Sequence, residues 1–167
     1  MIRVVVDDLA FVEADAVIRP TTAALDPLSS SLRRLEQVGG PTFWDQLSMQ
    51  QELAVGSAVV TGAGDLAADF VIHAVISSAS DPVTAGCVRH ALISVLQRAE
   101  DWQLRRLAIP PMGTGAGNLE LEESARVMVE ILAKVMVTTA YPEEVYIVVE
   151  SEADRGIFEA YLRRLPQ

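Results

Sequence analysis

The chain has 167 residues, of which 50% are hydrophobic and 22% are charged, and its formal net charge at pH 7 is −10. This length and apolar content predict a single domain, residues 1–167, whose core needs no disulfide or metal; the lone Cys87 in any case excludes both an intrachain disulfide and a multi-cysteine zinc site. The acidic balance argues against nucleic acid as the main partner, because proteins that grip phosphate backbones carry basic patches.

The first part of the chain alternates short apolar runs with breakers. Runs rich in β-branched residues predict strands, and apolar residues at helical spacing predict helices. The predicted elements are strands over residues 2–6, 14–18, 57–61 and 70–76, and helices over residues 27–38 and 42–53. We expect Pro20 to stop the second strand, and Gly39-Gly40-Pro41 to separate the two helices.

The second part of the chain alternates helix and strand. An apolar stripe over residues 88–99 predicts a long helix, with Asp81 as its N-cap and Pro82 as its first helical residue. Strands are predicted over residues 106–109 and 145–149, each followed by a helix, and Ser151 is the expected cap of the last one. This order predicts a layered α/β fold with a largely parallel sheet and helices on both faces.

A glycine-rich loop, Gly113-Thr114-Gly115-Ala116-Gly117, stands between a predicted strand and a predicted helix. Alternate glycines let the backbone turn tightly and approach a ligand, and the amides of such a loop, with the following helix N-terminus, can bind an anion such as diphosphate. A turn that only connects strand to helix is the alternative. The carboxylates of Glu120, Glu122 and Glu123 follow directly and lower the potential that an anion would feel.

Four segments carry a resemblance to a known family. They are Val6-Asp7-Asp8-Leu9, Ala14-Asp15-Ala16-Val17-Ile18, the stretch over residues 56–75 that contains Thr61-Gly62 and Val71-Ile72-His73, and the glycine-rich loop. In these segments and in their order the chain resembles the macrodomain family, which binds ADP-ribose and related nucleotides. The resemblance implies a three-layer α/β/α sandwich with a mixed, largely parallel central sheet.

The resemblance also implies ligand-binding residues, position by position. Asp8 matches the acidic residue that accepts a hydrogen bond from the adenine amino group, and Leu9 matches the next residue, whose backbone amide lies near the adenine. Gly113, Thr114, Gly115, Ala116 and Gly117 match the loop that wraps the diphosphate, and Asn118 a position near the adenine or the proximal ribose. Thr22 is also expected in the site. For Asp8 alone, a solvated carboxylate at a strand end is the alternative.

Two segments depart from the family pattern. Where the family reads Asn-Ala-Ala-Asn, this chain reads Arg19-Pro20-Thr21-Thr22, and the first glycine-rich loop is replaced by Asp26-Pro27-Leu28-Ser29-Ser30-Ser31. The half of the pocket nearest the distal sugar is therefore rebuilt. Arg19 either turns into the pocket, where it could pair with a phosphate or carboxylate, or points outward into solvent. We expect a structural hydrogen bond for His73.

Three functions follow from this pattern: a binding module for ADP-ribose or a related adenine diphosphate nucleotide, an ADP-ribosyl hydrolase, and a scaffold that has lost nucleotide binding. The expected partner is the small-molecule nucleotide, and an ADP-ribosylated protein is a second candidate partner. No catalytic residue, metal site or cofactor is predicted, and the oligomeric state is left open. The absence of a long apolar run predicts no membrane contact and a cytoplasmic location.

Overall fold

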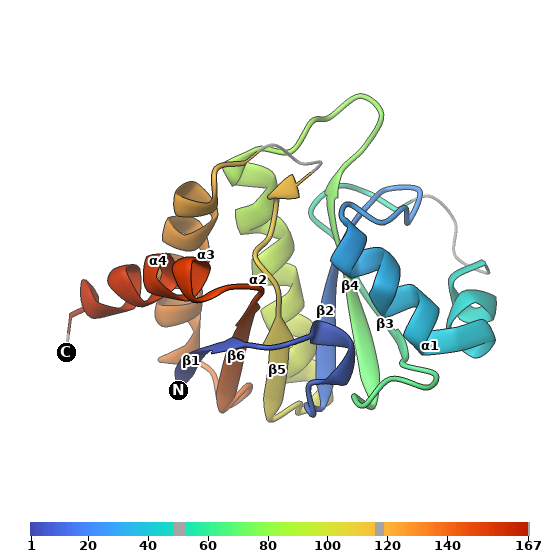
Figure 1. Cartoon of the computed structure of the whole chain (residues 1–167), viewed down its shortest axis with the longest axis horizontal. Helices are drawn as coiled ribbons and strands as arrows, with labels where there is room; N and C mark the ends of the chain where they lie inside the picture. The colour runs from blue at the N-terminus through green and yellow to red at the C-terminus, as the bar shows by residue number, and fades with distance from the viewer. Residues whose placement is uncertain (49–52, 116–118, 167) are drawn as a thin grey trace.

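A computed structural model describes residues 1–48, 53–115 and 119–166, in which one central sheet is covered by helices on both faces (Figure 1). The elements in chain order are β1 (Ile2–Val6), a short 3-10 helix η1 (Leu9–Phe11), β2 (Ala16–Thr22), α1 (Ser30–Ser48), β3 (Ala58–Gly62), β4 (Phe70–Ser77), α2 (Ala85–Trp102), β5 (Arg106–Ile109), α3 (Leu121–Met136), β6 (Glu144–Val149) and α4 (Glu152–Arg163). No helix among the described residues is both long and apolar enough to cross a membrane.

The sheet has the strand order β1-β6-β5-β2-β4-β3. All neighbouring strands are parallel except β3 and β4, which pair antiparallel between Ala58↔Ala74 and Gly62↔Phe70. The expected mixed, largely parallel sheet is therefore confirmed. The carboxyl ends of β1, β2, β5 and β6 all meet at one edge of the sheet, because these strands run in the same direction.

The alternation of side chains along each strand divides the core into two layers. Ile18, Ile72 and Ile147 contribute to the layer that packs against α2, α3 and Phe158 of α4. Val17, Val71, Ala108 and Val148 contribute to a second layer, which packs against η1 and the leucines of α1. The helices α2, α3 and α4 thus cover one face, and η1 and α1 cover the other.

The strand β2 continues to Thr22, so the expectation that Pro20 would stop it was wrong. Its partner β5 pairs with it only at Ala16↔Leu107 and Val17↔Ala108, whereas β4 follows it along its whole length. Beyond Val17 the β5 side of β2 carries no ladder. Pro20, which has no amide hydrogen, is therefore accommodated in β2 as a proline is at a sheet edge.

The start of α2 also differs from the prediction, because Thr84 is the N-cap and accepts a hydrogen bond from Cys87 N. Asp81 instead forms a tight turn, in which its carboxylate accepts from the Ser78 hydroxyl at 3.1 Å. Two other predictions are confirmed. Gly40, with φ of 77°, interrupts the helical path of α1, and Ser151 caps α4 by accepting from Asp154 N at 3.2 Å.

Candidate functional site

The carboxyl ends of β2 and β5 form a topological switch point in the sheet. These neighbouring strands separate after Val17 and Ala108, and the helices that follow them cover opposite faces, α1 after β2 and α3 after β5. In open α/β sheets a crevice forms where the chain leaves adjacent strands in opposite directions, and ligands bind in it. The topology alone therefore places a candidate site here.

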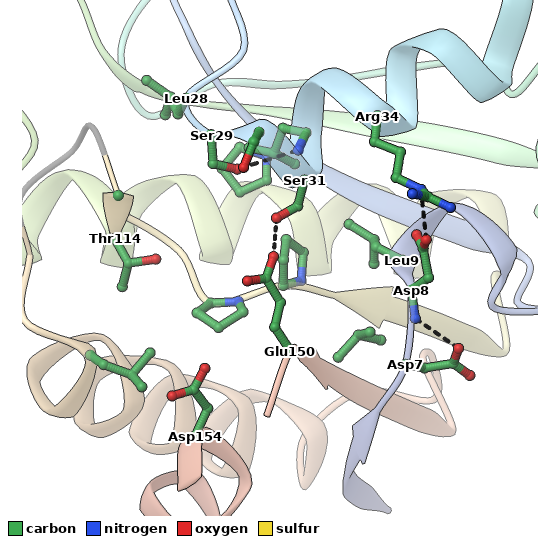
Figure 2. Close-up of a pocket in the computed structure, with 18 of the residues that line it drawn as sticks. Asp7, Asp8, Leu9, Leu28, Ser29, Ser31, Arg34, Thr114, Glu150 and Asp154 are labelled. Atoms are coloured by element: carbon green, nitrogen blue, oxygen red, sulfur yellow. Dashed lines mark hydrogen bonds and ion pairs between the residues drawn. The ribbon is translucent and has the colours of Figure 1, made fainter. Parts of the chain in front are cut away.

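A cavity of about 950 Å³ opens at this edge of the sheet. Its walls come from the carboxyl ends of β1, β2, β5 and β6, the first turns of α1, and the loop that follows β5 (Figure 2). This volume lies at the upper end of the range of small-molecule sites, roughly 300–1,000 Å³. Of the expected ligand residues, the cavity brings together Asp8, Leu9, Gly113, Thr114 and Gly115.

Asp8 lies at one end of the cavity and caps η1. Its Oδ1 accepts from Ala10 N at 3.0 Å, and its Oδ2 pairs with Arg34 Nε at 2.8 Å. The Arg34 guanidinium, which reaches over from α1, also lies 5.7 Å from the centre of the Phe11 ring. Asp8 is therefore an ordered, half-exposed carboxylate with an arginine beside it, and the adjacent Leu9 is buried.

The two described glycines of the loop serve different purposes. Gly113 has φ of 86°, and a Cβ there would lie 2.6 Å from Leu119 Cδ1, so packing beneath the loop requires a glycine. Gly115 has φ of 68° and faces the opposite wall, where a Cβ would lie 3.3 Å from the Leu28 carbonyl oxygen. The close approach of Gly115 to Leu28 narrows the cavity. Ala116, Gly117 and Asn118 lie outside the described residues.

Thr22 is not among the residues that line the cavity. Its hydroxyl accepts from Asp26 N at 3.1 Å, and the hydroxyl of Thr21 donates to the Asp26 carbonyl at 2.8 Å. Both threonines thus hold the turn that leads from β2 into the rebuilt segment. The residues of that segment which do line the cavity are Leu28, Ser29, Ser30 and Ser31.

Arg19 takes neither of the two expected orientations. Its side chain is fully buried in the layer between the sheet and α1, where it forms an ion pair with Glu36 and donates to the Leu25 carbonyl at 2.6 Å. Burial raises the pKa of the Glu36 carboxyl, and the charge of Arg19 opposes that rise. Arg19 therefore anchors α1 and the Leu25 turn behind the cavity instead of meeting a ligand.

His73 belongs to the same buried layer and makes the structural hydrogen bond expected from the sequence. Its Nδ1 lies 3.4 Å from Arg19 Nη1 and its Nε2 lies 2.8 Å from Thr61 Oγ1. A guanidinium can only donate, so Nδ1 accepts and Nε2 carries the hydrogen. Burial, with a smaller contribution from the charge of Arg19, lowers the pKa of His73 to about 3. The ring is neutral near pH 7 and does not face the cavity.

The charges that line the cavity are mostly negative. Arg34 is the one basic side chain among the described lining residues, whereas four carboxylates line it: Asp7, Asp8, Glu150 and Asp154. The hydroxyl of Ser31, in the first turn of α1, donates to the carboxylate of Glu150, which follows β6 (Figure 2). No group of acidic, histidine and cysteine side chains that could hold a metal occurs in the described part of the chain.

Sequence reasoning missed Arg34 and Glu150, and it named Ser31 only as part of the rebuilt segment that replaces the first glycine-rich loop. Glu150 follows the last predicted strand directly, and the carboxyl ends of parallel strands share one edge, so its position near the cavity could have been inferred. Arg34 carried no such signal, because a charged residue within a helix is usually on a solvated face.

Comparison with known proteins establishes the family. The family model described as Macro domain matches residues 33–128. An uncharacterized protein of Aquifex aeolicus is 32% identical over 134 residues, which are 80% of this chain and 81% of that protein. An O-acetyl-ADP-ribose deacetylase of an Enterobacter species is 27% identical over 167 residues, 96% of this chain and 93% of that protein. The chain belongs to the macro domain family.

Other relatives and solved structures agree with this fold. An uncharacterized protein of Mycobacterium tuberculosis is 30% identical over 73% of this chain, but the match spans only 34%, about one third, of that relative's length. The macrodomain of Oceanobacillus iheyensis with ADP superposes with a TM-score of 0.87 at 17% identity, over 96% of this chain and 88% of that one. The Trypanosoma brucei macrodomain in complex with ADP-ribose gives 0.86 at 17% identity, over 96% and 68%.

The buried ion pair predicts a non-additive pair of substitutions. Arg19→Met leaves the Glu36 carboxylate buried without its cation, which is expected to lower the free energy of unfolding by about 3–5 kcal/mol. The double variant Arg19→Met/Glu36→Leu removes both charges and is expected to recover most of that loss. Urea unfolding of the three proteins measures this, and a double variant as unstable as the single one would contradict it.

The buried neutral imidazole predicts a pH dependence of stability. The pKa of His73 is about 3 in the folded protein and near its ordinary value of 6.5 when unfolded, so the unfolded chain binds more protons between these values. The free energy of unfolding therefore falls as the pH drops below about 6.5, by up to about 1.4 kcal/mol per pH unit from this group. His73→Gln is expected to remove that contribution.

Unfolding curves of wild type and His73→Gln, recorded between about pH 7 and pH 5, measure the contribution as a difference, because titrating carboxylates affect both proteins alike. Parallel pH profiles would mean that His73 accepts a proton without penalty in the folded state.

Proposed function

We propose that the cavity binds ADP-ribose or a related adenine diphosphate nucleotide, with the adenine at Asp8 and Leu9 and the diphosphate on the Gly113–Gly117 loop. The observation that carries the proposal is the joint placement of these two groups. Asp8 and Leu9 line the same cavity as Gly113, Thr114 and Gly115, although the segments are more than 100 residues apart in the chain.

The Asp8 end has the chemistry that an exocyclic amino group requires. A carboxylate is acceptor-only and offers about four lone-pair directions, of which Ala10 N and Arg34 Nε engage one on each oxygen. An adenine amino group can therefore be accepted without loss of the η1 cap. Because Arg34 is 59% exposed, it can move aside or stay against the base at little cost in packing.

The loop end supplies positive potential from the main chain. The carboxylates around the cavity repel an anion, so a diphosphate has to be held by backbone amides and the start of a helix. Gly115 supports binding of the diphosphate by the loop backbone, because it is exposed to the cavity and any side chain there would point toward Leu28. The solved macrodomains with ADP and with ADP-ribose are relatives in fold that carry such ligands.

Hydrolysis is the second candidate, and it is favoured by one observation, the match to proteins named O-acetyl-ADP-ribose deacetylase over almost the whole chain. Catalysis on such an ester requires a water placed next to the distal sugar. Incubation with O-acetyl-ADP-ribose, followed by detection of free ADP-ribose, separates an enzyme from a module that binds without turnover. The scaffold alternative predicts neither binding nor release.

Binding is expected to raise the thermal midpoint. At a hundred times its Kd, ADP-ribose adds about 2.7 kcal/mol to the free energy of unfolding, which corresponds to a Tm increase of about 5–10 °C for a chain of this size. ADP is expected to stabilise more than AMP at equal concentration, because AMP lacks the second phosphate. No shift with ADP-ribose, ADP or AMP at millimolar concentration would rule out the proposed ligand class.

Gly115→Val is expected to abolish the ADP-ribose shift, because the added side chain enters the space between the loop and Leu28. The left-handed backbone at Gly115 adds a stability loss of only about 1–2 kcal/mol. Gly156→Val is the matched control, since a Cβ at this exposed position in α4 meets nothing within 4 Å. Retained binding in Gly115→Val, or equal loss in both variants, would refute the placement of the diphosphate.

A further inference from the structure

Glu150 and Ser31 form a contact across the cavity. Ser31 belongs to the first turn of α1, and Glu150 follows β6 on the opposite wall, 119 positions away in the chain. Figure 2 shows the Ser31 hydroxyl directed at the Glu150 carboxylate, in the space between the Asp8–Arg34 pair and Thr114. The middle of the cavity thus presents a carboxylate that already binds a neutral hydroxyl.

A carboxylate in this position selects among the parts of a nucleotide. It repels a phosphate, and because it accepts hydrogen bonds without donating any, it binds hydroxyl donors. One hydrogen bond from Ser31 leaves further lone pairs of Glu150 available. Acidic residues near strand ends recognise ribose hydroxyls in other nucleotide-binding α/β folds, where the same chemistry applies.

The order of groups in the cavity matches the order of groups in the ligand. With the base at Asp8 and the diphosphate at Gly115, the sugar that joins them has to cross the stretch where Glu150 lies. We infer that Glu150 accepts a hydrogen bond from a hydroxyl of this sugar and makes the cavity selective for ribonucleotides over deoxyribonucleotides. This inference rests on the proposed function and names a specificity-determining residue within it.

The charge of Glu150 has a second effect that an experiment has to separate from the first. Removal of a carboxylate raises the affinity for every anionic nucleotide, whatever its sugar. ADP and its 2′-deoxy and 3′-deoxy analogues carry the same charge, so the ratio of their affinities reports the hydroxyl alone. The ratio is therefore the informative quantity.

The test is calorimetric titration of ADP, 2′-deoxy-ADP and 3′-deoxy-ADP into four proteins: wild type, Glu150→Ala, Ser31→Ala and Glu152→Ala. Wild type is expected to prefer ADP over at least one analogue by about tenfold, the strength of one hydrogen bond to a charged group. Glu150→Ala is expected to bring that ratio close to one. Glu152→Ala removes an equal charge two residues away, outside the cavity lining, and is expected to keep the ratio.

Ser31→Ala separates recognition from a structural contact. If Glu150 receives the sugar, loss of the Ser31 hydroxyl leaves its carboxylate free and the preference for ADP persists. If the contact only braces α1 against β6, Ser31→Ala and Glu150→Ala change binding alike, which would overturn the inference. Equal affinities of wild type for ADP and both analogues would overturn it as well, with the proposed function intact. Failure of wild type to bind ADP and ADP-ribose would overturn both.

Discussion

The wall of the cavity that departs most from the family pattern depends on the buried guanidinium of Arg19. From β2 it reaches Glu36 on α1, the carbonyl of Leu25 and the ring of His73 on β4. A buried arginine is stabilised when its donors meet acceptors. Here acceptors from three separate segments meet Nη1 and Nη2, whereas the buried Nε has no hydrogen-bond partner among the described residues. The positions of α1 and of the turn before it are therefore fixed relative to the sheet, and with them Leu28, Ser31 and Arg34.

This arrangement gives the cavity an electrostatic character that its composition alone does not reveal. The guanidinium of Arg19 is turned away from the cavity and neutralised by Glu36, so it contributes no cation to a ligand. Arg34 is paired with Asp8 at one end, and Glu150 and Asp154 are acidic. An anionic ligand in such a cavity has to be held by the backbone of the glycine loop, while its uncharged hydroxyls meet the carboxylates.

Much of the fold could be predicted from the sequence, because hydrophobic periodicity and strand–helix alternation are local signals. Asp8, Leu9 and Gly113–Gly115 line one cavity, since they follow strands whose carboxyl ends share an edge, and their role as ligand-binding residues stays a prediction. Contacts between residues far apart in the chain could not be predicted from local patterns in the sequence. The continuation of β2 to Thr22 depends on its pairing with β4, and the contact of Ser31 with Glu150 joins residues 119 positions apart.

The orientation of Arg19 was predicted wrongly, because its side chain is buried beside Glu36. Strand alternation places residues 17, 19 and 21 on the same face of β2, the face that packs against α1, so periodicity favoured burial. The charge of Arg19 favoured contact with solvent or with a ligand. Burial and charge are compatible only because Glu36 of α1 forms an ion pair with Arg19. Whether a charged side chain can be buried depends on a partner of opposite charge. The pattern of residues along one strand does not reveal that partner.

Direct measurement of base recognition tests the central claim that Asp8 and the glycine loop bind one adenine diphosphate together. Calorimetric Kd values for ADP and inosine diphosphate, which replaces the amino group with an oxygen, should differ by about tenfold or more in wild type, and Asp8→Ala should remove most of that difference. Equal affinity of wild type for both nucleotides, or an unchanged preference in Asp8→Ala, would contradict the placement of the adenine at Asp8.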